Sequence, residues 1–336
     1  MRPRSASLRE GAADMTNGML GLSAYLHAQE PQLLTRERRE RMLTAADAAE
    51  AVKVLSECGY DVPERSSQLA VEQMLSAARE KLYDELRAMA PENAAVEVFS
   101  AKYDYHNAKV FLKSTVTGED AARLYMAGGR FDRRTLEECF SAGDFRMLTQ
   151  PMAEGIAEAQ TELDASGDAR RADVLLDRAY FAELGALAAE EPFLAGYVRL
   201  LIDAANLRAA VRLQRAGDGE LMPFVLSGGG NVLTQRLIDA RGALAALYQG
   251  GELSEAGELA EKLLSEGGTL TDFERACDDA IGLYFDAARR ALCGEEVVAY
   301  YLFARETEWT AIRTILSGRI AGLPEDAIRA KLREVA

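Results

Sequence analysis

The sequence has little of what most single-site enzymes need. Only two histidines, His27 and His106, occur in 336 residues, and no Ser/His/Asp or Cys/His set stands out. The glycine clusters lack a preceding strand pattern and a following Gly-Lys-Ser/Thr, so no phosphate-binding loop is predicted. The four cysteines form no CxxC or other zinc spacing, which is typical of a reducing compartment. We therefore expect no catalytic residue, no bound metal and no cofactor.

Other absences bound the fold and the partners. No apolar run approaches the length of a membrane span, so no transmembrane helix is predicted. Strand patterns are essentially absent, whereas Ala, Leu, Glu and Arg dominate, so an all-α fold is predicted. The net charge of −15 argues against nucleic acid and against direct binding to an anionic membrane. Residues 1–18 contain no signal-peptide core and are interpreted as a disordered leader, with Met15 or Met19 as alternative starts.

A short motif that occurs three times is the strongest positive signal. Its copies lie 99 and 105 residues apart. Recurrence at this period indicates a chain built from three copies of one unit rather than around a single active site. The copies are Asp104-x-x-Asn107-x-Lys109, Asp203-x-x-Asn206-x-Arg208 and Glu308-x-x-Ala311-x-Arg313. The third copy departs at Ala311, so the Asn is not needed for whatever the copies share.

Two further positions keep the same register and outline a long helix in each copy. A glutamate precedes each acid by 12 residues, and a glycine follows it by 14. An acidic residue suits the first turn of a helix, and a glycine suits the left-handed residue that ends one. Each copy is therefore predicted to be one helix of roughly 39 Å. The glutamates are Glu92, Glu191 and Glu296, and the glycines are Gly118, Gly217 and Gly322.

On a helical wheel, the acid of each copy falls inside an apolar stripe. At about 100° per residue, three positions that are apolar in every copy lie near it, and the Asn lies one step to its side. The Lys or Arg lies at the edge of the stripe, where a long side chain can reach solvent. The apolar residues are Phe111, Ala210 and Ile315; Ala108, Leu207 and Ile312; and Leu112, Val211 and Leu316.

The repeated acid is predicted to be buried, so it needs a partner. An unpaired buried carboxylate is costly, and the base of the same copy faces another direction. We expect the partner to come from another helix, such as its N-terminal amides. The favoured interpretation is that Asp104, Asp203 and Glu308 are structural anchors, and contacts with a partner protein are an alternative. A metal or catalytic site would need acids clustered within one helix pair, whereas these occur one per copy.

The repeat also predicts the domain organisation. Three similar helical lobes in tandem are expected at residues 19–118, 119–217 and 218–336, the last with a C-terminal helix that begins at Pro324. Each lobe would end with, or soon after, its motif helix.

Two glycine turns provide a weaker echo between copies. Leu136 lies seven residues after Gly129, and Leu237 lies seven residues after Gly230. Glycine pairs of this kind mark turns between helices. This match is less specific than the motif, because Gly-Gly turns and leucines are common in the chain.

Together these stretches resemble the C subunit of the V-type (A/V-type) ATP synthase or ATPase, called the d subunit in eukaryotic complexes. The resemblance spans most of the chain after the leader, and it rests on the combination, since any one helix alone is unspecific. The matching stretches are LLTRERRERMLTAADAAEAVKVLSECGY, YDYHNAKVFLKS, DRAYFAEL followed by PFLAGYVRLLIDAANLRAAVRLQ, and EWTAIRTILSGRIAGLPEDAIRAKLRE.

The resemblance implies three helical lobes arranged as a pseudo-threefold funnel, with no active site and no cofactor. It implies a position between the central stalk and the membrane rotor ring, where the protein transmits rotation in proton or sodium transport. It also implies a cytoplasmic location, peripheral to the membrane through the complex and without lipid insertion. Both directions of ATP chemistry stay open. A generic all-helical adaptor or scaffold would share the repeat but not these particular helices.

Overall fold

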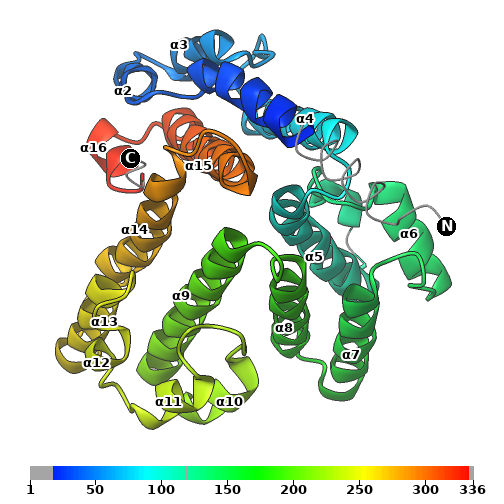
Figure 1. The fold of residues 1–336 in the computed structure, drawn as a ribbon, viewed down its shortest axis with the longest axis vertical. Helices are drawn as coiled ribbons and strands as arrows, with labels where there is room; N and C mark the ends of the chain where they lie inside the picture. Colours follow the sequence, from blue (N-terminus) through cyan, green and yellow to red (C-terminus); the bar gives the residue numbers. More distant parts are fainter. Residues whose placement is uncertain (1–17, 119, 333–336) are drawn as a thin grey trace, which may run out of the picture. The chain divides into compact units, whose positions relative to one another are not determined.

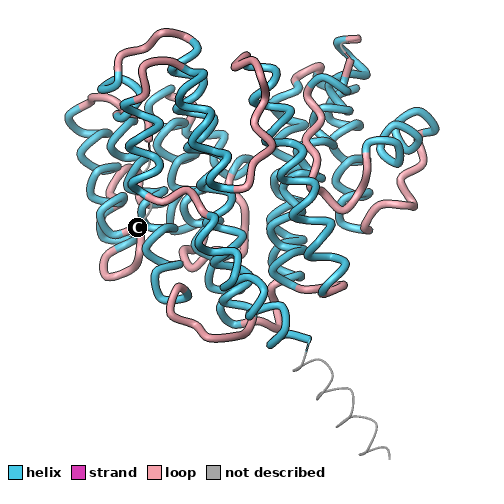
Figure 2. The backbone as a smooth tube through the Cα atoms, turned by 90° about the horizontal axis from the view of Figure 1, so that it is seen from above, coloured by secondary structure: helices cyan, strands magenta, loops and turns pink. Residues whose placement is uncertain are grey.

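The structure is a computed structural model that describes residues 18–118 and 120–332 (Figure 1). Every regular element in these two ranges is a helix, which confirms the all-α prediction (Figure 2). None of the described helices is long and apolar enough to cross a membrane. The predicted leader lies outside the described residues except for Gly18.

The helices follow one another with short connections. The N-terminal part contains a helix over residues 18–29, η1 (Glu30–Gln32), α2 (Arg36–Thr44), α3 (Ala48–Lys53), η2 (Val54–Cys58) and α4 (Gln68–Met89). The middle part contains α5 (Ala94–Thr117), η3 (Ala121–Arg123), α6 (Arg133–Ala142), α7 (Gln150–Ser166), α8 (Ala169–Leu187) and α9 (Pro192–Ala216). The remainder contains η4 (Gly219–Leu221), α10 (Met222–Val225), α11 (Thr234–Asp239), α12 (Ala245–Tyr248), α13 (Ser254–Glu266), α14 (Thr271–Ala288), α15 (Glu295–Ile320) and α16 (Glu325–Arg329).

Local sequence signals account for where the long motif helices end. Gly118, Gly217 and Gly322 all adopt the left-handed conformation, with φ of 69°, 82° and 69°. Glycine takes this conformation without the steric cost that a Cβ brings. The starts differ from the expected first-turn glutamate. Glu296 lies in the first turn of α15, and Glu191 is the residue before α9. Glu92 precedes α5 with φ of 62°, so it lies outside the helix.

The chain forms two compact units. One contains the described residues up to Val96 together with those from Ala287 onward, and the other contains Glu97–Asp286. In the first unit, α15 contacts α3 and α4, and α16 contacts α2, so segments from both parts of the chain share one core. In the second unit, α7 and α8 form a helical hairpin, and α9 contacts α8 and α13. The division into three lobes in a funnel stays a prediction.

The second unit has an aromatic cluster beside its aliphatic core. The rings of Phe99 and Tyr197 stack with centroids 5.4 Å apart, and Phe285 meets Tyr197 edge-on at 5.0 Å. These side chains come from α5, α9 and α14, so the cluster joins three long helices. Aromatic pairs of this geometry stabilise a core beyond the area they bury. The aliphatic core is built by α5 to α8 and includes Leu112, Leu136, Met152, Ile156, Leu175 and Leu176.

Close packing in the α7–α8 hairpin depends on a small residue. A Cβ added at Gly155 would lie 2.5 Å from the Cβ of Ala179, which is too close for two carbon atoms. Gly155→Ala should therefore lower stability by about 1–3 kcal/mol through overpacking, although alanine favours helices. Gly282→Ala is the matched control, because Gly282 lies within α14 with open space around its Cα. It should raise stability by up to about 1 kcal/mol. Urea unfolding midpoints that move in the same direction for both variants would contradict this packing.

Candidate functional site: the buried acids of the motif helices

The three motif helices are α5, α9 and α15, and each buries its acid. Asp104, Asp203 and Glu308 are 0%, 3% and 6% exposed. The apolar positions predicted to surround them are all buried as well, namely Phe111, Ala210, Ile315, Ala108, Leu207, Ile312, Leu112, Val211 and Leu316. The helical-wheel prediction of an acid inside an apolar stripe is therefore confirmed.

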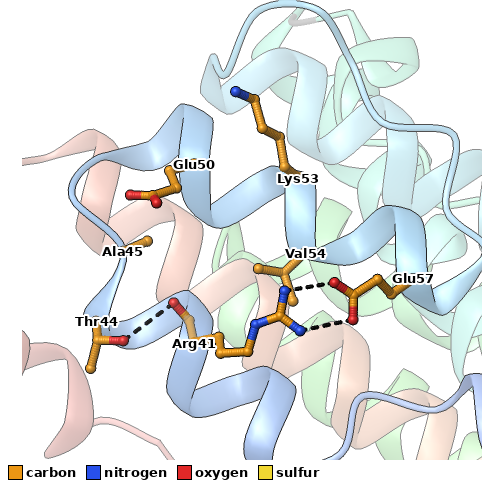
Figure 3. A pocket seen from close by; sticks show the side chains of 7 residues that line it. All are labelled: Arg41, Thr44, Ala45, Glu50, Lys53, Val54 and Glu57. Atoms are coloured by element: carbon orange, nitrogen blue, oxygen red, sulfur yellow. Dashed lines mark hydrogen bonds and ion pairs between the residues drawn. The ribbon is translucent and has the colours of Figure 1, made fainter.

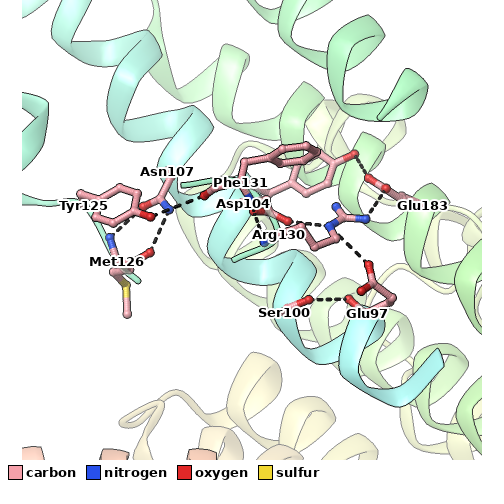
Figure 4. Close-up of polar contacts among 10 residues, drawn as sticks. Glu97, Ser100, Asp104, Asn107, Tyr125, Met126, Arg130, Phe131 and Glu183 are labelled. Carbon is pink, nitrogen blue, oxygen red and sulfur yellow. Dashed lines mark hydrogen bonds and ion pairs between the residues drawn. The ribbon is translucent and has the colours of Figure 1, made fainter. Parts of the chain in front are cut away.

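In the first copy, the partner of Asp104 is the loop that leads into α6 (Figure 4). Its Oδ1 accepts the backbone N–H groups of Arg130 at 2.8 Å and Phe131 at 3.2 Å. Its Oδ2 accepts the side-chain Nε–H of Arg130 at 2.6 Å. Phe131 directly precedes Asp132, the N-cap residue of α6. The amides come from the loop just before a helix rather than from the first turn of that helix, which corrects the expectation.

Arg130 is shared between two buried carboxylates. Its Nη1–H donates to Glu183 on α8 at 2.7 Å, and the hydroxyl of Tyr105 donates to the other oxygen of Glu183 at 2.8 Å. Burial raises the pKa of Asp104 to about 6, although the guanidinium of Arg130 acts in the opposite direction. Burial also disfavours ionisation of Glu183, but the bonds from Arg130 and Tyr105 outweigh it and lower the pKa of Glu183.

The second copy repeats this arrangement with neutral donors. Asp203 accepts the backbone N–H groups of Asn231 at 2.9 Å and Val232 at 3.1 Å. The side-chain amide of Asn231 donates to Asp203 at 2.9 Å, where the first copy has a guanidinium. Val232 directly precedes Leu233, the N-cap residue of α11. Burial raises the pKa of Asp203, and the three N–H donors oppose that shift.

The two glycine turns allow each loop to approach its acid. A Cβ added at Gly129 would lie 2.3 Å from Oδ1 of Asp104, and one added at Gly230 would lie 2.1 Å from Oδ1 of Asp203. Any other residue at these positions would displace the carboxylate or the loop. The echo between these turns therefore has a shared physical cause.

In the third copy a longer acid contacts a loop without glycine. Glu308 accepts the backbone N–H of Leu34 at 2.6 Å, and Leu34 directly precedes Thr35, the N-cap residue of α2. The loop lies 274 residues earlier in the chain. Glu308 also accepts the hydroxyl of Tyr60 and the Nη1–H of Arg305, the latter at 2.7 Å. Burial raises the pKa of Glu308, and Arg305 opposes that shift.

In two copies the motif Asn binds both the N–H and the C=O of one residue in the same loop. The side-chain amide of Asn107 donates to the carbonyl of Met126 at 2.9 Å and accepts its N–H at 2.8 Å. Asn206 makes the same pair of bonds with Ser227, at 2.7 and 2.8 Å. Met126 and Ser227 each lie four residues before the first loop residue whose backbone N–H donates to the acid. In the third copy the equivalent residue is Gln29, the last residue of the helix over residues 18–29. Ala311 stands at the motif position there and has no side-chain amide to form this pair of bonds.

The motif base forms an ion pair with another long helix of the same compact unit. Lys109 binds Asp177 of α8 at 2.5 Å, and Arg313 binds Glu72 of α4 through two bonds of 2.7 and 2.9 Å. Arg208 pairs with Asp278 of α14.

Four residues after the motif base, a second contact repeats in each copy. The pairs are Lys113 with Asp173, Arg212 with Glu274, and Ser317 with Gln68. We did not predict this second contact from the sequence, although its position is in register.

The motif residues bind loops and neighbouring helices of the fold. No group of three His, Cys, Asp or Glu side chains in the described ranges could hold a metal ion. A shallow hollow on the first unit is lined by Arg41, Thr44, Ala45, Glu50, Lys53, Val54 and Glu57 (Figure 3). Its central contact is an exposed ion pair in which Arg41 donates to Glu57 at 2.6 and 2.8 Å. Such a pair is solvated and already satisfied, so it gives no candidate for catalysis.

The close approach of the first loop can be tested at its second glycine. Gly129→Ala should lower stability by about 1–3 kcal/mol, because the added methyl group displaces the carboxylate of Asp104 and leaves buried N–H groups unpaired. Gly228→Ala is the control, because Gly228 lies in the equivalent loop of the second copy with open space around it. It should change stability by no more than about 0.5 kcal/mol. Equal urea midpoints for the two variants would disprove the steric role of Gly129.

The anchoring role of the acid can be tested at Asp203, because its three hydrogen-bond donors among the described residues are all neutral. Asp203→Ala should lower stability by about 1–3 kcal/mol, because three N–H donors lose their acceptor. Asp203→Asn should cost less, because its amide keeps one oxygen acceptor and almost the same volume. Urea midpoints of both variants provide the measurement. An Asp203→Ala midpoint at the wild-type value would rule out an anchoring role.

Comparison with known proteins identifies the family of the chain. A family model described as ATP synthase (C/AC39) subunit matches residues 22–331. The chain is 24% identical over 325 residues to the C subunit of the V-type sodium ATPase of Enterococcus hirae, covering 94% of this chain and 98% of the relative. It is 26% identical over 329 residues to the C subunit of the V-type ATP synthase of Thermus thermophilus, covering 90% and 95%. It is 29% identical over 287 residues to the C subunit of the A-type ATP synthase of Halobacterium salinarum, covering 77% and 76%. Because the family match spans nearly the whole sequence, this protein belongs to the ATP synthase (C/AC39) subunit family.

Proposed function

We propose that this protein is a non-catalytic rotor subunit of a V-type ATPase or ATP synthase. In this role it couples rotation of the central stalk to the membrane ring that carries the ions. The observation that carries the proposal is the family match over residues 22–331. The names of the relatives include a sodium ATPase and ATP synthases, so proton and sodium transport, and both directions of ATP chemistry, are compatible with it.

The use of the motif residues supports a mechanical role. A protein that transmits torque needs helices whose connections resist displacement. Here each motif helix binds a loop through its acid and a neighbouring long helix through its base. Each of these polar groups already has a hydrogen-bond or ionic partner within the chain. We infer that the motif takes no part in a reaction. In each copy the acid, which is Asp104, Asp203 or Glu308, and the base would together hold the motif helix in place against its neighbours.

We propose central stalk subunits and the membrane rotor ring as partners, with a cytoplasmic location peripheral to the membrane through the complex. A net charge of −15 disfavours direct attachment to an anionic lipid surface. Attachment would then depend on the assembled complex, and it would follow the concentration and affinity of the protein partners. A generic helical adaptor is the competing function. It would share the buried anchors but would not be required for coupling.

Deletion of the gene separates the two functions. If the protein couples stalk to ring, ATP hydrolysis by the soluble head should persist in the deletion strain, while ATP-driven ion pumping into membrane vesicles should fall to background. The head and the ring should also separate on purification, and the wild-type gene should restore both properties. The purified protein alone should hydrolyse no ATP. Pumping that persists with an intact head–ring complex would exclude the coupling role and favour the adaptor.

A further inference from the structure

The second unit contains buried negative charge that its own cations do not fully neutralise. Asp104 is fully buried, and Glu183 is 4% exposed, yet both depend on the single guanidinium of Arg130 (Figure 4). With both acids ionised, this cluster carries one net negative charge in the protein interior. Asp203 is likewise buried, and its three donors are all neutral. Burying uncompensated charge is costly, so both sites favour uptake of a proton.

The acidic side chains near Asp104 strengthen this tendency, whereas Arg130 opposes it. The hydroxyl of Tyr105, on α5 itself, is already committed to Glu183. Glu97, one more acid on α5, lies 3.9 Å from Nε of Arg130 and competes for the same cation. From α8 the facing charge is Glu183, and from the loop before α6 it is Arg130. Three carboxylates thus surround one guanidinium, and protonation of Asp104 relieves their mutual repulsion.

Around Asp203 no cation of the described residues binds the carboxylate directly. Arg199, on α9 itself, donates to the side-chain oxygen of Asn231 at 3.2 Å. The loop contributes the neutral Asn231. The negative charge of Glu252 raises the pKa of Asp203 further. Burial and the nearby charge of Asp203 both raise the pKa of the Tyr248 hydroxyl. The second site therefore shares the excess negative charge of the first, although it reaches it with different residues.

We propose that Asp104 and Asp203 are two independent proton-sensitive latches, each of which holds its own loop and the following short helix against a motif helix. The first latch holds residues 126–142, which contain α6. The second holds residues 227–239, which contain α11. Proton uptake tightens each latch, so both segments open more readily at neutral than at mildly acidic pH. This inference does not depend on the proposed role in the rotor.

The direction follows from proton linkage. The pKa of Asp104 is about 6 in the closed state, against 3.8 for an exposed aspartate. The closed state therefore binds a proton more tightly than the open state, and its advantage is complete below about pH 4 and lost as pH rises through 6. Between pH 5 and pH 7, opening of the first segment should increase about tenfold. The pKa of Asp203 is also raised, so the second segment should respond in the same direction.

Hydrogen–deuterium exchange of the full chain at pH 5 and pH 7, corrected for the intrinsic effect of pH on exchange, measures this opening. We expect both segments to lose protection at pH 7 relative to α7, which carries neither acid. Asp104→Asn removes the titrating group, so the response should vanish over residues 126–142 and persist over residues 227–239. Asp203→Asn should give the reverse result. The two variants thus act as controls for each other.

Two outcomes would overturn the proposal. One is a wild-type protein whose two segments show the same protection relative to α7 at both pH values. The other is a response over residues 126–142 that survives Asp104→Asn. If the asparagine variants do not fold, Glu183→Gln decides the matter for the first latch, because it leaves Arg130 to Asp104. The response of that segment between pH 5 and pH 7 should then be smaller than in the wild-type protein, and an unchanged response would contradict the latch.

Discussion

The burial of one carboxylate per motif helix is the constraint on which most of the local structure depends. An acid inside an apolar stripe must find several N–H donors, because an unsatisfied buried charge is costly. In every copy these donors include the backbone of the residue just before the N-cap of a short helix: Phe131, Val232 and Leu34. The acid thus fixes where a loop passes and where the next helix begins. The path of each connecting segment therefore depends on the acid of the motif helix as well as on the sequence of the segment itself.

The length of the acid and the size of the loop residue vary together. Where the acid is Asp, the residue two before the last donor is Gly129 or Gly230, and a Cβ there would overlap the carboxylate. Where the acid is Glu308, one methylene longer, the equivalent residue is Gln32. A longer acid can contact a loop that stands further away, so glycine is no longer needed. Substituting Glu for Asp in the first two copies would therefore overfill the same space that the glycines keep free.

The sequence contained enough information for the helices but not for the donors. Apolar periodicity predicted the buried faces of the motif helices, and the register of the glycines predicted where these helices end, because both are properties of a single helix. The sharing of Arg130 between Asp104 and Glu183 could not be predicted, since it joins three segments through space. The second ionic contact, at Lys113 and Arg212, was in register and could have been found by extending the motif comparison by one turn. Glu92 was misplaced because register alone does not show that the helix starts after it.

The direction of these contacts along the chain changes how a repeat can be defined. Asp104 and Asp203 bind loops that follow their helices, whereas Glu308 binds a loop near the other end of the chain. The partner helix obeys the same rule, since Lys109 and Arg208 reach forward to α8 and α14, while Arg313 reaches α4. A repeat that begins with its motif helix would include the loop and the partner helix to which that helix is bound. On this definition the third copy is completed by the N-terminal part of the chain. In the first compact unit, Glu308 joins the two parts of the chain. Asp104 and Asp203 hold loops in the second unit from the same motif position.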